Sequence, residues 1–287
     1  MGNNLQISCI TSMYRCEEYL KDFLLHLKKI ENLNEIEFIF IHNDPTLKEK
    51  TIINEFINNN FFINIVYKEV PLEGLYSSWN RAVKIAKGKF ITIWNVDDIR
   101  FSDSFINQKN AFTEDNIGLV YGNRYLTTKY ESKKLKEIKV KDVSKSKWNK
   151  KFQGGCFYMW RRSIHNIIGY FDEQFISLGD QDFWYRVVQY YKIKKTNHYI
   201  GIFLAEPGKG ISKSSNISSI EKIVIGLRYG FFTYINIRGW KKALKDYQVR
   251  SIQNDGKKKS CEILKYSNIF VYLISLKYIL FSFVRGN

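Results

Sequence analysis

The sequence is poor in the residues and patterns that characterise several protein classes. Only three of its 287 residues are proline, and with 17 scattered glycines this excludes collagen-like and proline-rich disordered chains. No two of the four cysteines have CxxC spacing, which argues against zinc knuckles and predicts free thiols of a reducing compartment. Residues 266–276 form the longest mostly apolar stretch near the C-terminal end, and they are too few to cross a bilayer.

Familiar catalytic signatures are also missing. The chain has neither GxGxxG after its first predicted strand nor GxxxxGKS/T, which argues against Rossmann dinucleotide binding and P-loop hydrolysis of nucleoside triphosphates. It has no GxSxG, and its four histidines show no metal-ligand spacing. The first residues lack a basic region followed by an apolar run, so no secretory signal is predicted and we expect a cytoplasmic protein.

Positive charge is what the chain has in excess. Lys and Arg number 45 against 28 Asp and Glu, which gives a formal net charge of +17. Hydrophobic residues make up 45%, enough for a globular core. The charge points to anionic partners: nucleic acid, phosphorylated small molecules or the acidic face of a membrane.

The first 100 residues alternate between strand and helix patterns. Strands are predicted at residues 6–11, 36–41, 63–66 and 90–94, and helices at 17–30, 47–58 and 74–86, the last with a C-cap at Gly88. Repeated strand–helix units with short loops predict a doubly wound, mostly parallel sheet, which binds ligands at the carboxyl ends of its strands. Two of these strands end in clusters of Asn and Asp, at residues 42–44 and 95–98.

The rest of the chain is more basic. Residues 127–151 contain ten Lys and three acidic residues, which predicts a solvated, mobile segment. A helix is predicted from residue 180 or 181 to 191, and helical spacing dominates after residue 212. Residues 263–284 combine aromatic and aliphatic bulk with spaced basic residues, so they form either an interfacial helix with a basic fringe or a helix packed on the preceding domain.

Two pairs of carboxylates are candidates for chemistry. Asp97 and Asp98 follow a strand, where adjacent carboxylates repel each other unless a cation such as Mg²⁺ or Mn²⁺ neutralises them, although Asp is also a favoured helix N-cap. Asp180 begins a predicted helix, where it is either a general base or one of the acidic residues that complement the helix dipole. Asp182 is placed to pair with Arg186 one turn later.

The motifs together follow the order of a known family. They lie at residues 10–20, 39–44, 74–82, 88–91, 95–98, 160–163, 169–173 and 179–184. The series resembles the nucleotide-sugar glycosyltransferases of family 2, which have the GT-A fold. The resemblance covers residues 6–212. It implies a GT-A catalytic domain at 1–212. The helical spacing and basic residues after it predict a helical extension at 213–287, which either associates with a membrane or packs on the catalytic domain.

The resemblance also assigns the donor site. It places Thr11, Tyr14 and either Asn43 or Asp44 near the nucleotide base, the choice being open because residues 42–44 read HND where the family commonly has two Asp before a Gly. The metal motif begins with Asn where the family has Asp. The remaining two positions keep their carboxylates. Asp97 would approach the ribose or the metal, and Asp98 would hold Mn²⁺ or Mg²⁺ against the diphosphate.

On the acceptor side, the resemblance makes Asp180 the base that deprotonates the attacking hydroxyl, so that in-line attack inverts the anomeric centre. Gly154 and Gly155 would let the backbone approach the acceptor, or they form an ordinary turn. Asp182 and Trp184 would also face the acceptor, although Trp184 is equally expected in the core.

The expected partners are a nucleotide-sugar donor, with a UDP-sugar favoured, and a glycan or lipid-linked glycan acceptor. The chain would act in the cytoplasm, as a peripheral protein on the cytosolic face of an anionic membrane. Two competing hypotheses are a basic nucleic-acid-binding protein and an inactive glycosyltransferase-like scaffold. Retention on a DNA column above about 0.3 M salt would favour nucleic-acid binding, which we do not expect because the charge is diffuse.

Overall fold

The computed structural model describes residues 5–130, 132–143, 156–207 and 215–229. The chain forms two compact units. The first comprises residues 1–171 and 187–209, and the second comprises residues 172–186 and 210–287. Residues 172–186 thus belong to the second unit, although they precede the predicted boundary at residue 212.

The first unit opens with the predicted alternation of strands and helices. Its elements are β1 (Ile7–Met13), α1 (Glu17–Leu27), a 3-10 turn (Leu33–Glu35), β2 (Ile36–Asn43), α2 (Leu47–Asn59), β3 (Asn64–Val70), α3 (Leu75–Ile85) and β4 (Phe90–Ile93). Strands β3, β2, β1 and β4 are neighbours in that order and run parallel. All eight residues of β2 are buried, as expected for a parallel strand covered on both faces.

The sheet continues past β4 with strands of both directions. The later elements are β5 (Ile99–Arg100), α4 (Ser104–Asn110), β6 (Ile117–Thr127), β7 (Lys136–Ile138), β8 (Tyr158–Arg161), a 3-10 turn (Arg162–Ile164), α6 (His165–Ile168) and β9 (Lys192–Leu204). The strand order among the described residues is β3-β2-β1-β4-β8-β6-β9-β5, with β7 paired to β6. Because β8 is antiparallel to both β4 and β6, strand β6 and its parallel neighbour β9 run in the same direction as β1.

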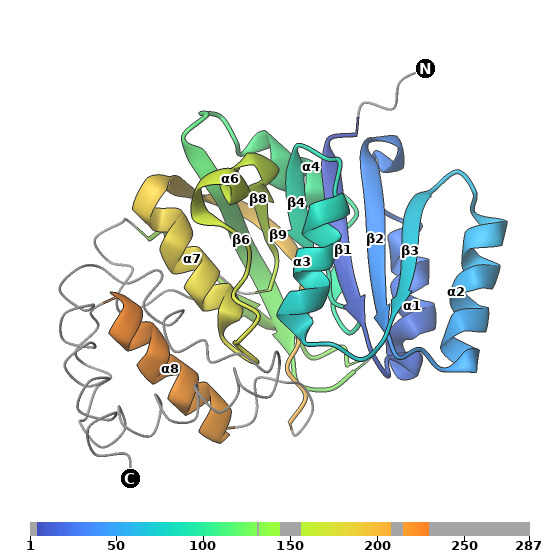
Figure 1. Ribbon diagram of the computed structural model, residues 1–287. Coiled ribbons are helices and arrows are strands. Elements are labelled where there is room, and N and C mark those ends of the chain that lie inside the picture. The colour runs from blue at the N-terminus through green and yellow to red at the C-terminus, as the bar shows by residue number, and fades with distance from the viewer. Residues whose placement is uncertain (1–4, 131, 144–155, 208–214, 230–287) are drawn as a thin grey trace, which may run out of the picture. The chain divides into compact units, whose positions relative to one another are not determined.

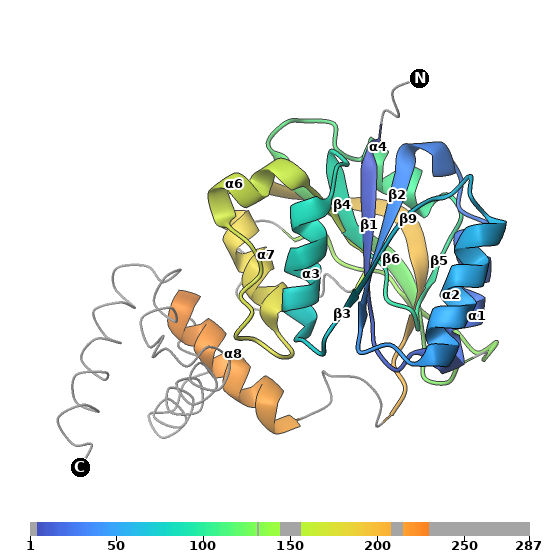
Figure 2. The ribbon, with the colours of Figure 1, turned by 45° about the vertical axis from the view of Figure 1, so that its right-hand side comes forward.

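Helices cover both faces of this sheet. Figures 1 and 2 show α3 on one face and α1 with α2 on the other. The strand order β3-β2-β1-β4 explains this arrangement. The chain moves from β1 to the edge strand β3 through α1 and α2, and it returns to the other side of β1 through α3. Because crossovers between parallel strands have the same handedness, helices that connect strands in opposite directions along the sheet lie on opposite faces.

Aromatic side chains pack the face that α1 and α4 cover. Phe23 of α1 lies edge-on to Trp94 at a centroid distance of 4.9 Å, and Phe105 of α4 lies 6.2 Å from Phe38. All four side chains are buried, and each contributes about 1.5–3 kcal/mol to folding by leaving water. These ring contacts pack α1 and α4 against the sheet.

Gly88 does not cap α3 as predicted. The helix ends at Ile85 with Ala86 in an extended conformation, so no left-handed glycine is needed there. A Cβ on Gly88 would lie 2.6 Å from the backbone carbon of Ile7 and the backbone nitrogen of Ser8. The residue is glycine because the chain passes this close to β1 as it enters β4.

The predicted solvated, mobile segment at residues 127–151 exposes its lysines in the described part, but this part is also attached to the sheet. Strand β7 pairs with β6, and the side chains of Val140 and Val143 are buried. The N–H of Val143 donates to the Tyr121 hydroxyl at 3.1 Å, and the N–H of Val140 donates to Asn123 Oδ1 at 3.1 Å. Aliphatic residues spaced among the lysines dock this segment on β6. Residues 144–151 lie outside the described residues.

The described part of the second unit contains α7 (Gly179–Tyr190), which begins in this unit, and α8 (Ser215–Tyr229). Glu221 of α8 accepts hydrogen bonds from the backbone N–H groups of residues 176–178 at 2.7–2.9 Å. Arg228 of α8 pairs with Asp172 and Asp182. The predicted amphipathic stretch at 263–284 lies outside the described residues, and no helix within the described ranges is long and apolar enough to cross a membrane.

Candidate active site

The carboxyl ends of β1, β2 and β4 bring the predicted donor-site residues to one edge of the sheet. Met13 at the end of β1 is in register with His42 of β2. The N–H of Trp94, just after β4, donates to the carbonyl of Ile10 at 3.1 Å. The loops that follow these three strands are therefore neighbours, and they carry residues 14–16, 44–46 and 95–98.

Asp97 and Asp98 differ in exposure. Asp97 is partly exposed, whereas Asp98 is 2% exposed. Asp98 Oδ1 accepts the N–H of Leu204 at 3.0 Å, and its Oδ2 accepts the amide of Asn95 at 3.2 Å. Burial, together with the adjacent Asp97 carboxylate, raises the pKa of Asp98 well above its ordinary value. The two carboxylates thus form one electrostatically coupled pair at the carboxyl edge.

Asn43 is held inside the protein. It is buried, and its amide nitrogen donates to Ser78 Oγ at 2.9 Å and to Ser12 Oγ at 3.2 Å. Its Oδ1 accepts the backbone N–H of Glu73 at 3.2 Å. Asn43 therefore connects the end of β1 to the start of α3.

Asp44 lies in the open beside it. Its side chain is 53% exposed and pairs with Arg15 at 2.7 Å, and the Arg15 guanidinium lies 5.5 Å from the centroid of the half-exposed Tyr14 ring. Arg15 and Asp44 both have left-handed backbone conformations, with φ of 47° and 42°. Such conformations are uncommon outside glycine and concentrate at functional sites. Sequence reasoning missed Arg15, because a left-handed arginine has no sequence signal.

Thr11 is buried in β1, and its hydroxyl has no hydrogen-bond partner among the described residues. It lies two residues before the end of the strand. Among the predicted contacts of the base, Tyr14 and Asp44 are the exposed ones, and Thr11 and Asn43 are enclosed.

Asp180 is partly exposed in the first turn of α7, where its Oδ1 accepts the N–H of Gln181 at 2.8 Å. Asp182, two residues later, is completely buried. It accepts from Arg186 at 3.0 Å, from Arg228 at 2.8 Å and from the Tyr229 hydroxyl at 2.8 Å. The predicted Asp182–Arg186 pair is confirmed.

The other predicted acceptor residues are either buried or outside the described residues. The burial and the three partners of Asp182 leave it no exposed surface with which to contact an acceptor, and Trp184 is 1% exposed, in the core. Gly154 and Gly155 lie outside the described residues.

A mostly parallel sheet with helices on both faces is the architecture of the GT-A class of α/β folds. The chain belongs to Glycosyl transferase family 2, whose family model matches residues 8–172, more than half of its length. The predicted family and fold are both confirmed.

Two curated relatives show the range of the family. The glycosyltransferase MJ1057 of Methanocaldococcus jannaschii is 28% identical over 181 residues, which is 60% of each chain. The minor teichoic acid biosynthesis protein GgaB of Bacillus subtilis is 28% identical over 112 residues, which is 39% of this chain and 12% of that protein. The chain thus spans less than two thirds of the length of either relative.

Solved structures share the fold at low identity. Residues 1–349 of TarS from S. aureus, also solved with UDP-GlcNAc, match with a TM-score of 0.59 and 16% identity, covering 91% of this chain and 69% of that one. The mannosyltransferase PcManGT of Pyrobaculum calidifontis, in complex with GDP-Man and Mn²⁺, matches with a TM-score of 0.60 and 12% identity, covering 98% and 81%.

Proposed function

We propose that the chain is an inverting glycosyltransferase that moves a sugar from a nucleotide-sugar donor, with a UDP-sugar favoured, to a hydroxyl of a growing surface glycan. The observation that carries this proposal is the Asp97–Asp98 pair at the carboxyl edge of the sheet, within the segment that the family model matches. The teichoic acid protein GgaB and the complex of TarS with UDP-GlcNAc support the substrate class.

The donor set at residues 95–98 fits a divalent cation. Asp97 offers a partly exposed carboxylate, and each oxygen of Asp98 that accepts one hydrogen bond keeps another lone pair. Such hard oxygen ligands suit Mn²⁺ or Mg²⁺, and the Mn²⁺ complex of PcManGT supports this choice. We assign direct contact with the cation to Asp97. Asp98 either holds the loop in place or provides a further ligand. When bound, the cation neutralises charge that develops on the leaving nucleoside diphosphate.

We assign the nucleotide base to Tyr14 and Asp44. Both are exposed beside the ends of β1 and β2, whereas the amide of Asn43 is already engaged by Ser12 and Ser78. Arg15 adds a cation to the same surface, where it can pair with a phosphate oxygen. Thr11 supports this surface from within the sheet.

We assign deprotonation of the acceptor hydroxyl to Asp180. Its carboxylate is partly exposed in the first turn of α7, as a base that must contact the acceptor requires. Asp182 holds α7 in place through its ion pairs, and we keep Gly154 and Gly155 as acceptor contacts. The acceptor is a glycan or lipid-linked glycan at the cytosolic face of the membrane.

The test is to measure release of nucleoside diphosphate from a panel of UDP- and GDP-sugars, with glycan and lipid-linked acceptors, with and without Mn²⁺ or Mg²⁺. We expect one donor to turn over, with an acceptor and a metal both required. Asp97→Asn serves as the control for enzyme contaminants, because the contaminant activity would survive it. Absence of turnover with every donor, while the protein is folded, would favour the inactive scaffold.

A further inference from the structure

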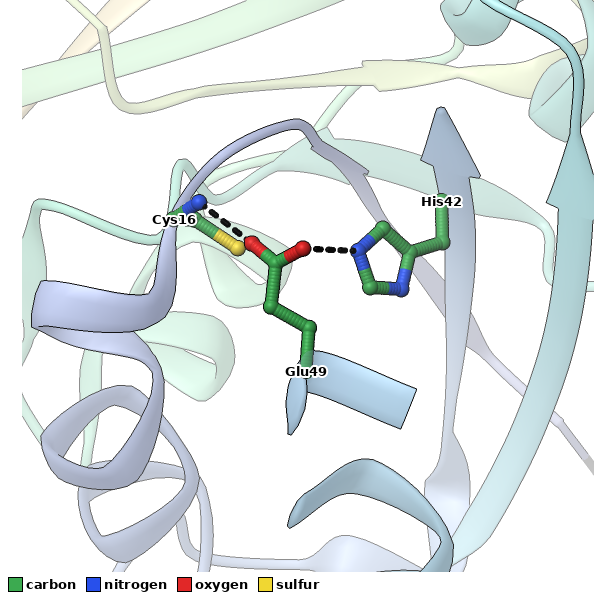
Figure 3. A group of neighbouring side chains, drawn as sticks. All are labelled: Cys16, His42 and Glu49. Atoms are coloured by element: carbon green, nitrogen blue, oxygen red, sulfur yellow. Dashed lines mark hydrogen bonds and ion pairs between the residues drawn. The ribbon is translucent and has the colours of Figure 1, made fainter. Parts of the chain in front are cut away.

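A second group of metal-binding side chains lies in the first unit, apart from Asp97 and Asp98. Cys16 caps α1, His42 is near the end of β2, and Glu49 lies in the first turn of α2. One potential ligand atom from each residue lies within 4.8 Å of the other two. Figure 3 shows the thiol, the carboxylate and the imidazole turned toward one another.

The group is enclosed. The side chains of His42 and Glu49 are completely buried, and Cys16 is 6% exposed. Among the described residues, no Lys or Arg pairs with Glu49, and Nε2 of His42 has no hydrogen-bond partner. Buried carboxylates normally have a cationic partner, and buried polar atoms are normally satisfied. Nε2 of His42 is therefore a buried nitrogen without a hydrogen bond, beside a carboxylate whose ion-pair contact among the described residues is the same imidazole, at 3.5 Å.

Hydrogen bonds from neighbouring hydroxyl and backbone groups already orient the side chains of His42 and Glu49. The hydroxyl of Tyr67 lies 2.9 Å from the other ring nitrogen of His42, Nδ1. Glu49 Oε1 accepts the N–H of Cys16 at 2.7 Å, and its Oε2 accepts the N–H of Thr46 at 3.0 Å. Metal-binding histidines and carboxylates are held in this way by partners beyond the metal.

The separation of the imidazole nitrogen and the carboxylate oxygen suits a small tetrahedral ion, and the thiol sulfur lies within 4.8 Å of both. His42 Nε2 lies 3.5 Å from Glu49 Oε2. Two ligands that are each about 2.0–2.3 Å from a tetrahedral zinc ion lie about 3.3–3.6 Å apart. Sulfur, imidazole and carboxylate together form a donor set for Zn²⁺, whereas Mg²⁺ prefers oxygen alone.

We propose that Cys16, His42 and Glu49 bind a zinc ion, with water in the fourth position, that joins the β1–α1 and β2–α2 connections. The thiolate and the carboxylate balance the charge of the ion, and the thiol proton goes to solvent when the metal binds. Tyr14, Arg15 and Asp44 lie within two residues of these ligands, so the zinc would stiffen the surface that carries them. The site itself does not depend on the proposed glycosyl transfer.

The experiment uses the full chain, freed of metal with a chelator and titrated with Zn²⁺ and with Co²⁺. We expect at least one zinc per chain by elemental analysis, and we expect cobalt to give intense tetrahedral d–d bands with a thiolate charge-transfer band in the near ultraviolet. Carboxylate sites such as Asp97–Asp98 give no thiolate band. This first measurement uses the unmutated chain, so its result does not depend on whether any variant folds.

Variants then locate the site. Cys16→Ser should remove the thiolate band, and Tyr67→Phe should weaken zinc binding about 10–100-fold, the usual effect of losing an outer partner. Cys156→Ser, Cys261→Ser and Asp98→Asn are the matched controls and should keep both the band and the affinity. Failure of the unmutated chain to bind zinc would overturn the proposal, and so would a band that survives Cys16→Ser or disappears with a control.

Discussion

Asp97 and Asp98 are adjacent but have different surroundings. Because Asp97 is the more exposed, Asp97→Asn should weaken Mn²⁺-dependent UDP binding at least about tenfold, which is about 1.4 kcal/mol, and leave the free energy of unfolding within about 0.5 kcal/mol.

Asp98→Ala should also lose metal-dependent binding and stay folded. It leaves the N–H of Leu204 without its acceptor, so it should additionally cost about 1–3 kcal/mol of stability.

Calorimetry with UDP and Mn²⁺, alongside urea unfolding, separates these effects. Unchanged affinity and metal dependence in Asp97→Asn would remove Asp97 from the metal site, and the same result in Asp98→Ala would remove Asp98. An unchanged free energy of unfolding in Asp98→Ala would contradict its role in holding the loop.

Asp180 and Asp182 should separate chemistry from folding. Asp180→Asn keeps the shape of the side chain but cannot accept a proton. Glycosyl transfer should fall by about 10²–10⁴-fold, the usual contribution of a positioned base, while binding of UDP and metal stays as in the parent. When the two variants are compared at equal folded fraction, Asp182→Asn should lose less glycosyl transfer activity than Asp180→Asn. The reverse order of the two variants in a transfer assay would make Asp182 the base.

The ion pairs of Asp182 should appear in the pH dependence of stability. Burial alone would raise the pKa of Asp182, but Arg228 and Arg186 outweigh it and hold that pKa below its ordinary value. The carboxylate therefore contributes stability that is present above about pH 3.9, the ordinary value, and is lost as the pH falls through the lowered value in the folded state.

Asp182→Asn should cost about 3–5 kcal/mol near neutral pH, because it breaks the buried ion pairs of Asp182 with Arg186 and Arg228 and leaves Arg228 with only its Asp172 pair of the two described above. The difference in unfolding free energy between parent and variant should shrink as the solution is acidified. A difference that stays constant from pH 7 to pH 3 would show that the ion pairs are not its source.

At the scale of elements, the entry of the chain into β4 depends on close contact with β1. Gly88→Ala would place a Cβ 2.6 Å from the backbone of Ile7 and Ser8, so the strand must shift, at a cost of about 1–3 kcal/mol. Gly74→Ala is the matched control: it lies at the start of α3, the nearest atom to its new Cβ is 3.9 Å away, and it should cost less than about 1 kcal/mol. Equal thermal unfolding of the two variants would contradict this account.

At the scale of the whole molecule, the net charge of +17 and the basic residues near the C-terminal end predict binding to an acidic surface. The full chain should sediment with anionic liposomes, and a chain ending near Asp255 should do so much less. Neutral liposomes are the control, since electrostatic attraction requires lipid charge. Equal sedimentation of both chains with anionic liposomes would remove the interfacial-helix hypothesis.

The sequence by itself determined the strand–helix alternation of the first 94 residues, because each of these elements has a local periodicity and short connections leave few topologies. It also placed Asp97, Asp98 and Asp44 at the ends of strands, since a strand and the polar residues after it are adjacent in the chain. The Asp182–Arg186 pair was predictable for the same reason: it needs only one helical turn.

Tertiary structure decided everything that depends on residues distant in the chain. It enclosed Asn43 through partners from β1 and α3 while exposing Asp44 beside it, and it gave the buried Asp182 a second cation, Arg228, 46 residues away. The cluster of Cys16, His42 and Glu49 matches no metal-binding sequence motif, because three separate elements supply one residue each. Burial and long-range pairing are properties of the packed sheet, so no local pattern encodes them.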